Sequence, residues 1–320
     1  MPRIGVVMAT YNGEKYVAKQ LESIVEQSLK PNIIVVSDGG STDNTVKICR
    51  DYLSNTDIDY TILESTSHLS VTKNFERAYT FCKSAKYIFF ADQDDIWLPN
   101  KISDLVQVME DNGAMLGFSN ASIVDEDMNY LGKDLWSSIG FKPKDVINIY
   151  QPNDTEMFLR LIKGNYVTGM CMCVHKSAHK YIVPMSYNTL HDYWIALICA
   201  NVGVTVAYNK ALVKYRQHRD NVVGTKRSIK KALANAYDYK SRLDRRVRLV
   251  DDLEYRLRGF MKTANTKLIK EYKDYLILRQ GIIDGSTKAY TPLTCFEQYK
   301  RFELDPMSIV AKDLIVRFGV

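Results

Sequence analysis

The chain has 320 residues, 46% of them hydrophobic and 25% charged, with 8 prolines and 16 glycines. These proportions exclude collagenous, low-complexity and wholly disordered chains, and at roughly 100–200 residues per domain the length indicates one large domain or one domain with a substantial addition. The net charge of +6 divides unevenly, because residues 1–225 carry 22 basic and 25 acidic side chains whereas residues 226–320 carry 21 and 12.

Short apolar runs alternate with helical patterns along the first 120 residues. The predicted strands are Ile4–Ala9, Ile33–Ser37, Tyr60–Leu63 and Tyr87–Ala91, and the predicted helices are Glu14–Glu26, Thr42–Tyr52 and Val71–Lys83. The strand runs are almost continuously apolar, as expected for strands covered on both faces. This alternation predicts an α/β fold with a mainly parallel sheet flanked by helices.

The pattern becomes less regular after residue 115. We predict strands at Met115–Ser119, Tyr166–Val174 and Val204–Tyr208, and a helix at Asp192–Asn201. Beyond residue 218, one apolar helical face runs from Ile229 to Phe260 among many basic residues. We therefore predict two parts: an α/β domain of residues 1–225, and a basic, mainly helical region of residues 226–320. The excess of positive charge in the second part predicts that it faces an anionic partner.

The cysteines and the N-terminal segment bear on the compartment. The six cysteines lack the paired spacing of a zinc site, which predicts buried free thiols in a reducing compartment. The first ten residues do not resemble a signal peptide, and the longest nearly apolar stretch, residues 194–208, is shorter than the roughly 20 residues of a spanning helix. We expect a cytoplasmic protein.

Polar side chains follow three of the predicted strands. Residues 10–13 follow the first strand, residues 38–41 the second and residues 92–95 the fourth. Ligands of open α/β sheets bind beyond the carboxyl ends of the strands, so these segments predict a site along one rim of the sheet.

Three carboxylates stand together at the end of the fourth strand. Asp92, Asp94 and Asp95 directly follow a buried apolar run, where like charges repel. Oxygen ligands of this kind suit Mg²⁺ or Mn²⁺ held jointly with a substrate phosphate. A helix N-cap is the alternative, although one aspartate would suffice for a cap.

Together these segments resemble glycosyltransferase family 2. The resemblance rests on Val6–Asn12, Asp38–Thr45 and Ala91–Pro99, and it covers about residues 1–225. The further motifs His191–Trp194 and Tyr215–His218 are similar to those of bacterial rhamnosyltransferase-like members that build cell-surface polysaccharides. The family implies a GT-A fold and an inverting, metal-dependent transfer of a sugar from a nucleotide-diphosphate donor.

The resemblance also implies roles for single residues. Asp92 and Asp94 match the metal-binding pair, and His218 matches a histidine that completes the metal shell, with Mn²⁺ or Mg²⁺ as the ion. Asp192 matches the general base, with an N-cap as its other interpretation. Matches to the donor site, which in the family binds a UDP- or dTDP-linked sugar, are Ala9, Thr10, Tyr11, Asp38, Lys73, Asp92 and Gly169.

One position departs from the family pattern. Gly39 stands where members usually carry a second aspartate that accepts a hydrogen bond from the pyrimidine N3–H. Either Asp38 takes that role, or base recognition is weaker or relies on backbone groups. The departure keeps a second hypothesis open: a catalytically weak or silent nucleotide-binding scaffold of a polysaccharide assembly complex.

The basic C-terminal region has two interpretations. Its apolar face predicts a helix packed on the rest of the protein, with the basic face in water. The resemblance suggests an acceptor that is a saccharide or a lipid-linked saccharide, so the same helix is a candidate for contact with an anionic membrane surface, peripheral at the inner face of the cell membrane. No nucleic-acid-binding motif accompanies the basic residues, and we expect no nucleic-acid partner.

Overall fold

The computed structural model describes residues 3–152, 154–218, 236–260, 263–286, 292 and 294–318. The chain divides into two compact units, the first comprising Met1–Pro152 and Tyr166–Val223, the second Asn153–Asn165 and Gly224–Val320. The predicted boundary near residue 225 lies outside the described residues. The short segment Asn153–Asn165 groups with the second unit although the predicted division places it in the first.

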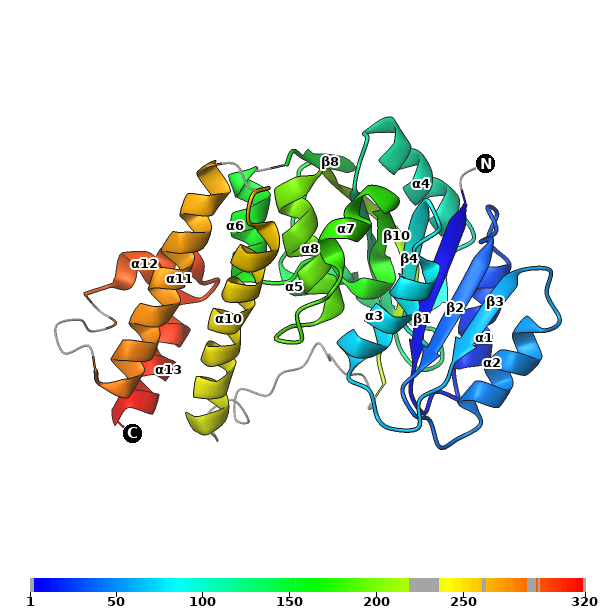
Figure 1. Cartoon of the computed structure of the whole chain (residues 1–320), viewed down its shortest axis with the longest axis horizontal. Coiled ribbons are helices and arrows are strands. Elements are labelled where there is room, and N and C mark those ends of the chain that lie inside the picture. The colour runs from blue at the N-terminus through cyan, green and yellow to red at the C-terminus, as the bar shows by residue number, and fades with distance from the viewer. Residues whose placement is uncertain are drawn as a thin grey trace. The chain divides into compact units, whose positions relative to one another are not determined.

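The first unit is built on one mixed sheet (Figure 1). Along the main path the strands run β3-β2-β1-β4-β9-β6-β10-β5, with β7 beside β6 and β8 beside β10. Neighbours among β1 to β4 are parallel, as are β6 and β10, whereas β9 is antiparallel to both its neighbours. The strands are β1 Ile4–Thr10, β2 Ile33–Asp38, β3 Asp59–Leu63, β4 Tyr87–Ala91, β5 Ile96–Trp97, β6 Leu116–Val124, β7 Tyr130–Asp134, β8 Ile147–Tyr150, β9 Met172–His175 and β10 Thr205–Arg216.

The register of the central strands brings the predicted rim together. All five residues of β4 are buried, as are six of the seven in β1, which agrees with their continuous apolar runs. Thr10 at the end of β1 pairs with Asp38 at the end of β2, and Met8 pairs with Ala91 of β4. The segments that follow Thr10, Asp38 and Ala91 therefore begin side by side at one edge of the sheet.

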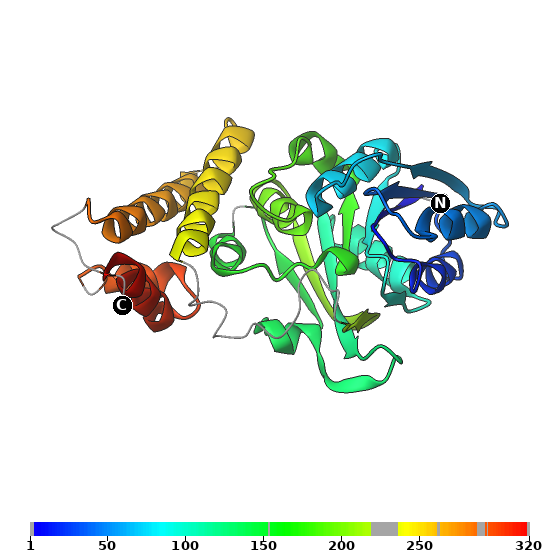
Figure 2. The same ribbon diagram turned by 90° about the horizontal axis from the view of Figure 1, so that it is seen from below.

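Helices cover both faces of this sheet. Helix α3 packs on β1 and β2, and in Figure 2 it lies across the strands from α1. The helices of the first unit are α1 Val17–Val25, α2 Thr45–Leu53, α3 Val71–Cys82, α4 Lys101–Asp111, α5 Leu135–Ile139, α7 His179–Ile182 and α8 His191–Val202. All six cysteines of the chain are buried free thiols, which confirms the prediction of their burial and free state, whereas the reducing compartment stays a prediction.

The predicted strand Tyr166–Val174 is wrong over its first half. Gly169–Cys171 forms a 3₁₀ turn, and only Met172–His175 is a strand, β9, between β4 and β6. Side chains hold the turn: the buried Lys101 ammonium donates to the Met170 carbonyl, and the Gly169 N–H donates to Asp192. An apolar run alone could not reveal these tertiary contacts.

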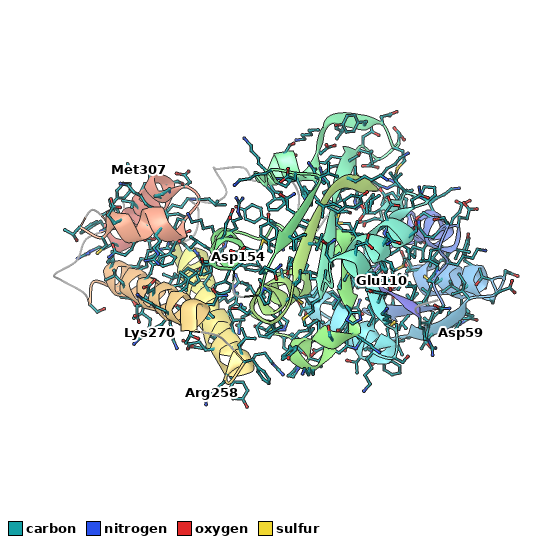
Figure 3. The ribbon with its side chains drawn as sticks, turned by 90° about the horizontal axis from the view of Figure 1, so that it is seen from above. Asp59, Glu110, Asp154, Arg258, Lys270 and Met307 are labelled. Atoms are coloured by element: carbon teal, nitrogen blue, oxygen red, sulfur yellow. The ribbon has the colours of Figure 1, made fainter. Side chains whose placement is uncertain are left out.

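The second unit is helical. It consists of α6 Thr155–Lys163, α10 Ala236–Leu257, α11 Thr263–Asp284, α12 Phe296–Phe302 and α13 Pro306–Phe318. Asp154, labelled in Figure 3, caps α6 by accepting a hydrogen bond from the Glu156 N–H at 2.8 Å. Of the apolar face predicted from Ile229 to Phe260, Leu243, Val250 and Leu257 are buried in α10, whereas Phe260 lies beyond that helix and is 55% exposed. Its first residues lie outside the described part of the chain. No helix among the described residues combines the length and apolar character needed to cross a membrane.

Candidate active site

The ends of β1 and β2 are joined by side-chain bonds. The Thr10 hydroxyl donates to Asp38 Oδ2 at 2.8 Å, and the Gly39 N–H donates to the Thr10 carbonyl at 2.8 Å. Asp38 also accepts the Gly40 and Ser41 N–H groups on Oδ1 and the Ser41 hydroxyl on Oδ2. With four accepted bonds and 2% exposure, the Asp38 carboxylate is saturated from within the chain.

Tyr11 presents an exposed ring beside this turn. Its side chain is 44% exposed, and its ring centroid lies 4.6 Å from that of His68 in an edge-to-face arrangement. The Gln93 amide bonds both backbone groups of Tyr11, at 2.9 Å to the N–H and 3.1 Å to the carbonyl. The middle residue of the Asp92–Asp94 motif thus fixes the backbone that carries the Tyr11 ring.

Asn74 fills the space beside Gly39. A Cβ on Gly39 would lie 3.2 Å from Asn74 Nδ2 and 3.4 Å from the Thr10 carbonyl oxygen. Asn74 is 4% exposed, and its Nδ2 donates to the Thr10 carbonyl at 3.1 Å. Its Oδ1 has no hydrogen-bond partner, and a buried acceptor without a partner is costly. The departure at Gly39 is therefore accompanied by an unsatisfied amide oxygen on the neighbouring helix.

Lys73 precedes Asn74 in the first turn of α3. Its side chain is exposed, and its ammonium lies 5.2 Å from the ring centroid of Tyr187. Because Tyr187 is itself 55% exposed, this contact leaves the ammonium in reach of an anion. Ala9, the other residue assigned to the donor site, is half-buried near the end of β1.

The acidic segment after β4 is held against the end of β10. His218 Nε2 lies 2.8 Å from Asp94 Oδ2. The Arg216 guanidinium donates to the Asp94 carbonyl at 2.8 Å, and the Arg216 N–H donates to Asp95 Oδ1 at 3.0 Å. The structure therefore brings Asp94 and His218 together across 124 positions of sequence.

Burial and mutual repulsion act on the carboxylates of this segment. Burial, with the negative charges of Asp94 and Asp192 nearby, raises the pKa of Asp92 to about 7. Burial and the charges of Asp94 and Asp92 raise the pKa of Asp95 well above its ordinary value, and Asp95 Oδ2 has no hydrogen-bond partner. Asp94 and Asp192 therefore each lie within electrostatic range of Asp92.

These groups suit a divalent cation that shares its shell with a substrate. Among the residues that the structure describes, no three His, Cys, Asp or Glu side chains form a complete protein site for a metal ion. The Asp94–His218 contact offers two ligands at one point. Mg²⁺-type sites commonly use one or two carboxylates and take their other ligands from phosphates and water, so the residues present fit such an ion.

Asp192 lies at the start of α8, against the 3₁₀ turn. It is 6% exposed, and its Oδ2 accepts the Gly169 N–H at 3.1 Å. The preceding His191 is 4% exposed and stacks on Phe75 with ring centroids 3.8 Å apart. Neither His191 ring nitrogen has a hydrogen-bond partner, and burial lowers the pKa of this imidazole to about 3. Asp192 is thus fixed beside Gly169 by a rigid aromatic stack.

Lys101 supplies a buried positive charge behind the rim. It is fully buried, its ammonium lies 3.3 Å from the centroid of the Trp97 ring, and it bonds the Met170 carbonyl. Burial lowers its pKa to about 7, against the opposing influence of Asp95 and Asp92. It therefore ties the 3₁₀ turn to α4 and offsets part of the carboxylate repulsion.

Sequence reasoning missed several contributors to this site. They are His68, Asn74, Gln93, Lys101 and Arg216, which act through contacts with residues remote in sequence. The local signal was position alone: Gln93 stands inside the acidic motif, Asn74 follows Lys73, and Arg216 lies within the Tyr215–His218 motif.

Comparison with known sequences decides the family. The profile described as "Glycosyl transferase family 2" matches residues 5–182. The chain belongs to glycosyl transferase family 2. It is thus a glycosyltransferase, and the matched region contains the ends of β1, β2 and β4 together with Gly169.

Two curated relatives of this family-2 chain cover different shares of it. The dTDP-rhamnosyl transferase RfbG of Shigella flexneri is 39% identical over 116 residues, which are 35% of this chain and 40% of that protein. An uncharacterized glycosyltransferase of Haemophilus influenzae is 27% identical over 224 residues, 68% of this chain and 66% of the relative. The chain thus matches less than two thirds of the length of either relative.

Solved structures share the GT-A fold. TarS 1–349 of S. aureus, in complex with UDP-GlcNAc, superposes with a TM-score of 0.61 at 12% identity, over 98% of this chain and 89% of that 1–349 chain. The mannosyltransferase PcManGT of Pyrobaculum calidifontis, in complex with GDP-Man and Mn²⁺, gives a TM-score of 0.51 at 14% identity, over 98% and 85%. At such identities the likeness concerns the fold.

Proposed function

We propose that this chain is an inverting, metal-dependent glycosyltransferase that uses a nucleotide-diphosphate sugar, with Asp192 as the general base. One observation carries the proposal: at the end of β4, His218 Nε2 lies 2.8 Å from Asp94 Oδ2. The neighbouring Asp92 feels the negative charges of both Asp94 and Asp192. A cluster of repelling carboxylates at a strand end suits a reaction that brings a cation and a diphosphate to that point.

The donor would lie along the rim formed by β1, β2 and β4. Tyr11 offers an exposed ring for stacking on the base, beside Ala9 and Thr10. The Lys73 ammonium would attract the diphosphate. Asp38 would hold the shape of the turn and would not contact the base, because all four acceptor positions of its carboxylate are occupied.

Asp94 and His218 would hold the metal ion, with Asp92 beside them. When bound, a divalent cation neutralises the charge that develops on the departing diphosphate. Mn²⁺ or Mg²⁺ suits this mixed set of carboxylate, imidazole and phosphate ligands. The Arg216 bond to the Asp94 carbonyl keeps this backbone in place during the reaction.

Asp192 would accept the proton of the attacking hydroxyl. Its Oδ2 already accepts the Gly169 N–H, and this bond orients the carboxylate. One base and no enzyme nucleophile lead to a single displacement, so the product would have the opposite anomeric configuration from the donor. Gly169 would line the donor sugar from the same turn.

Asn74 would read the base in place of an aspartate at position 39. Its unsatisfied Oδ1 is an acceptor suited to a ring N–H, and the bond from its Nδ2 to Thr10 fixes which way the amide points. Asn74→Ala should weaken UDP binding by about tenfold, the usual worth of a buried hydrogen bond, and leave the affinity for N3-methylated UDP unchanged. Equal losses for both nucleotides would contradict this role.

The relatives support a choice of donor to test. RfbG is named for dTDP-rhamnose and TarS was solved with UDP-GlcNAc, so we propose a UDP- or dTDP-linked donor, with rhamnose as the first sugar to test. The acceptor would be a growing polysaccharide or a lipid-linked saccharide. The excess of basic residues in 226–320 would attract the chain to an anionic membrane surface in a salt-sensitive manner.

A donor panel with matched variants tests the proposal. UDP- and dTDP-sugars are incubated with the full chain in Mn²⁺ or in EDTA, and donor cleavage and product configuration are measured. Asp192→Asn should retain donor binding and lose about 10²–10⁴-fold in rate, whereas Asp94→Asn should lose metal-dependent nucleotide binding. Asp104→Asn, an acidic control on α4, should behave as wild type. Nucleotide binding without turnover of any donor would favour the silent scaffold.

A further inference from the structure

A cavity of about 240 Å³ opens in the second unit between α10, α11 and α13. Four basic side chains line it, against one acidic side chain. Its polar lining consists of Asp238, Tyr239, Arg242, Arg246, Arg279 and Lys312. Glu303 and Asp313 pair with Arg246 and Arg279 behind this lining, and one positive charge then remains in excess, which favours an anion.

The inner wall of the cavity is rigid. Arg279 is 2% exposed and donates to both Asp313 oxygens at 2.9 Å, to Glu303 at 3.0 Å and to the Tyr239 hydroxyl at 2.7 Å. Glu303 also accepts Arg246 at 3.0 Å. Both carboxylates are buried behind the guanidinium groups, so they hold these groups in place before any ligand arrives.

Two cationic side chains that line the cavity make few contacts of their own. Within the described part of the chain, Lys312 makes no hydrogen bond or ion pair, although guanidinium groups share its cavity. The Arg242 side chain is 52% exposed, and among the residues that the structure describes its one ion pair is with Asp238. An ammonium beside guanidinium groups is unfavourable by itself, and an anion between them removes that repulsion.

We infer that this cavity binds a phosphate or diphosphate group, with Lys312 and Arg242 as its principal contacts. Guanidinium forks match the tetrahedral oxygens of phosphate, and the ammonium adds a compact charge. The site lies within the second unit and requires neither a sugar donor nor sugar transfer. The phosphate belongs either to a dissolved compound or to a lipid headgroup, which share this chemistry.

Two measurements on the full chain separate these sources. Inorganic pyrophosphate is titrated calorimetrically in EDTA, which prevents metal-mediated binding at Asp94. In parallel, the chain is sedimented with vesicles of phosphatidic acid or of neutral phosphatidylcholine. The variants are Lys312→Gln and Lys312→Arg, and the matched control is Lys270→Gln, an exposed lysine of α11 labelled in Figure 3 that has no described partner.

We expect binding that Lys312→Gln weakens by about tenfold or more, the usual effect of losing one charge-assisted contact. Lys312→Arg and Lys270→Gln should leave it within about twofold of wild type, because charge is kept in the first and the cavity is untouched in the second. Pyrophosphate binding with this pattern identifies a dissolved ligand, and the same pattern on phosphatidic acid vesicles alone identifies a headgroup. No binding in either arm, or equal losses for Lys312→Gln and Lys270→Gln, would overturn the site.

Discussion

The tight approach of Gly169 to His191 gives the sharpest prediction. A Cβ on Gly169 would lie 2.6 Å from His191 Nε2 and 3.1 Å from Cε1. Ordinary contacts begin near 3.4 Å, so Gly169→Ala requires a displacement of about 0.8 Å. The imidazole cannot easily supply it, because it is buried and stacked on Phe75 and Phe90. The turn that donates to Asp192 must move instead.

Both stability and rate should respond to Gly169→Ala. Overpacking of this kind lowers the free energy of unfolding by about 1–3 kcal/mol. Moving the Gly169 N–H away from Asp192 Oδ2 removes one of the bonds that orient the carboxylate, and a misplacement of about 1 Å at a reacting group lowers the rate by about 10²-fold. The assay measures kcat for donor turnover, with nucleotide affinity and urea unfolding determined on the same preparation.

Gly117→Ala is the matched control. Its Cβ would lie 2.6 Å from Met109 Cγ and 2.8 Å from Sδ, and a methionine side chain can adapt. We expect a comparable loss of stability with kcat within a few-fold of wild type. Removing the obstructing ring in the double variant Gly169→Ala/His191→Ala should restore part of kcat. If Gly169→Ala turns over at the wild-type rate, or if both glycine variants lose kcat equally, the positioning argument is refuted.

Three further predictions concern buried charges. Burial lowers the pKa of His191 to about 3, against about 6.5 in the unfolded chain, so the free energy of unfolding of the wild type falls as the pH drops below 6.5. Between pH 6.5 and 4.5, His191→Phe should lose about 2–3 kcal/mol less of this free energy than the wild type, as measured by urea unfolding at each pH. Arg279→Met leaves Asp313 buried without its cation and Glu303 with Arg246 alone, and it should lower the free energy of unfolding by about 3–5 kcal/mol, whereas an unchanged urea midpoint would contradict this network. Lys101→Met removes the bond to Met170 and should lower kcat about tenfold or more without weakening nucleotide binding, which calorimetry checks.

The strands of the rim were predictable because their signal is local. Ile4–Thr10 and Tyr87–Ala91 are continuous apolar runs followed by polar residues, and such runs favour parallel strands covered on both faces. The family motifs then indicated that Asp94 and His218 would meet, and the two side chains do lie in contact at 2.8 Å. Their assignment as metal ligands stays a prediction.

The antiparallel strand β9 and the turn before it were not predictable in the same way. Residues 166–174 are mostly apolar, so periodicity alone cannot place a turn among them. Lys101 bonds Met170 across 69 positions and Asp192 bonds Gly169 across 23. These long-range bonds decide where the chain turns, and no propensity of residues 169–171 contains them.

Several polar groups at the rim destabilise the fold locally. Asn74 Oδ1 and Asp95 Oδ2 are buried without hydrogen-bond partners, and Asp92 is held beside two other carboxylates. Each of these is unfavourable in the isolated chain, since burial penalises unpaired polar atoms and like charges. The surrounding contacts are correspondingly strong: Gln93 makes two bonds to the Tyr11 backbone, and Arg216 braces the segment at Asp94 and Asp95. A fold that fixes unfavourable groups so firmly is adapted to the ligand that relieves them, and a metal-bound nucleotide diphosphate would supply both the positive charge and the hydrogen-bond donors.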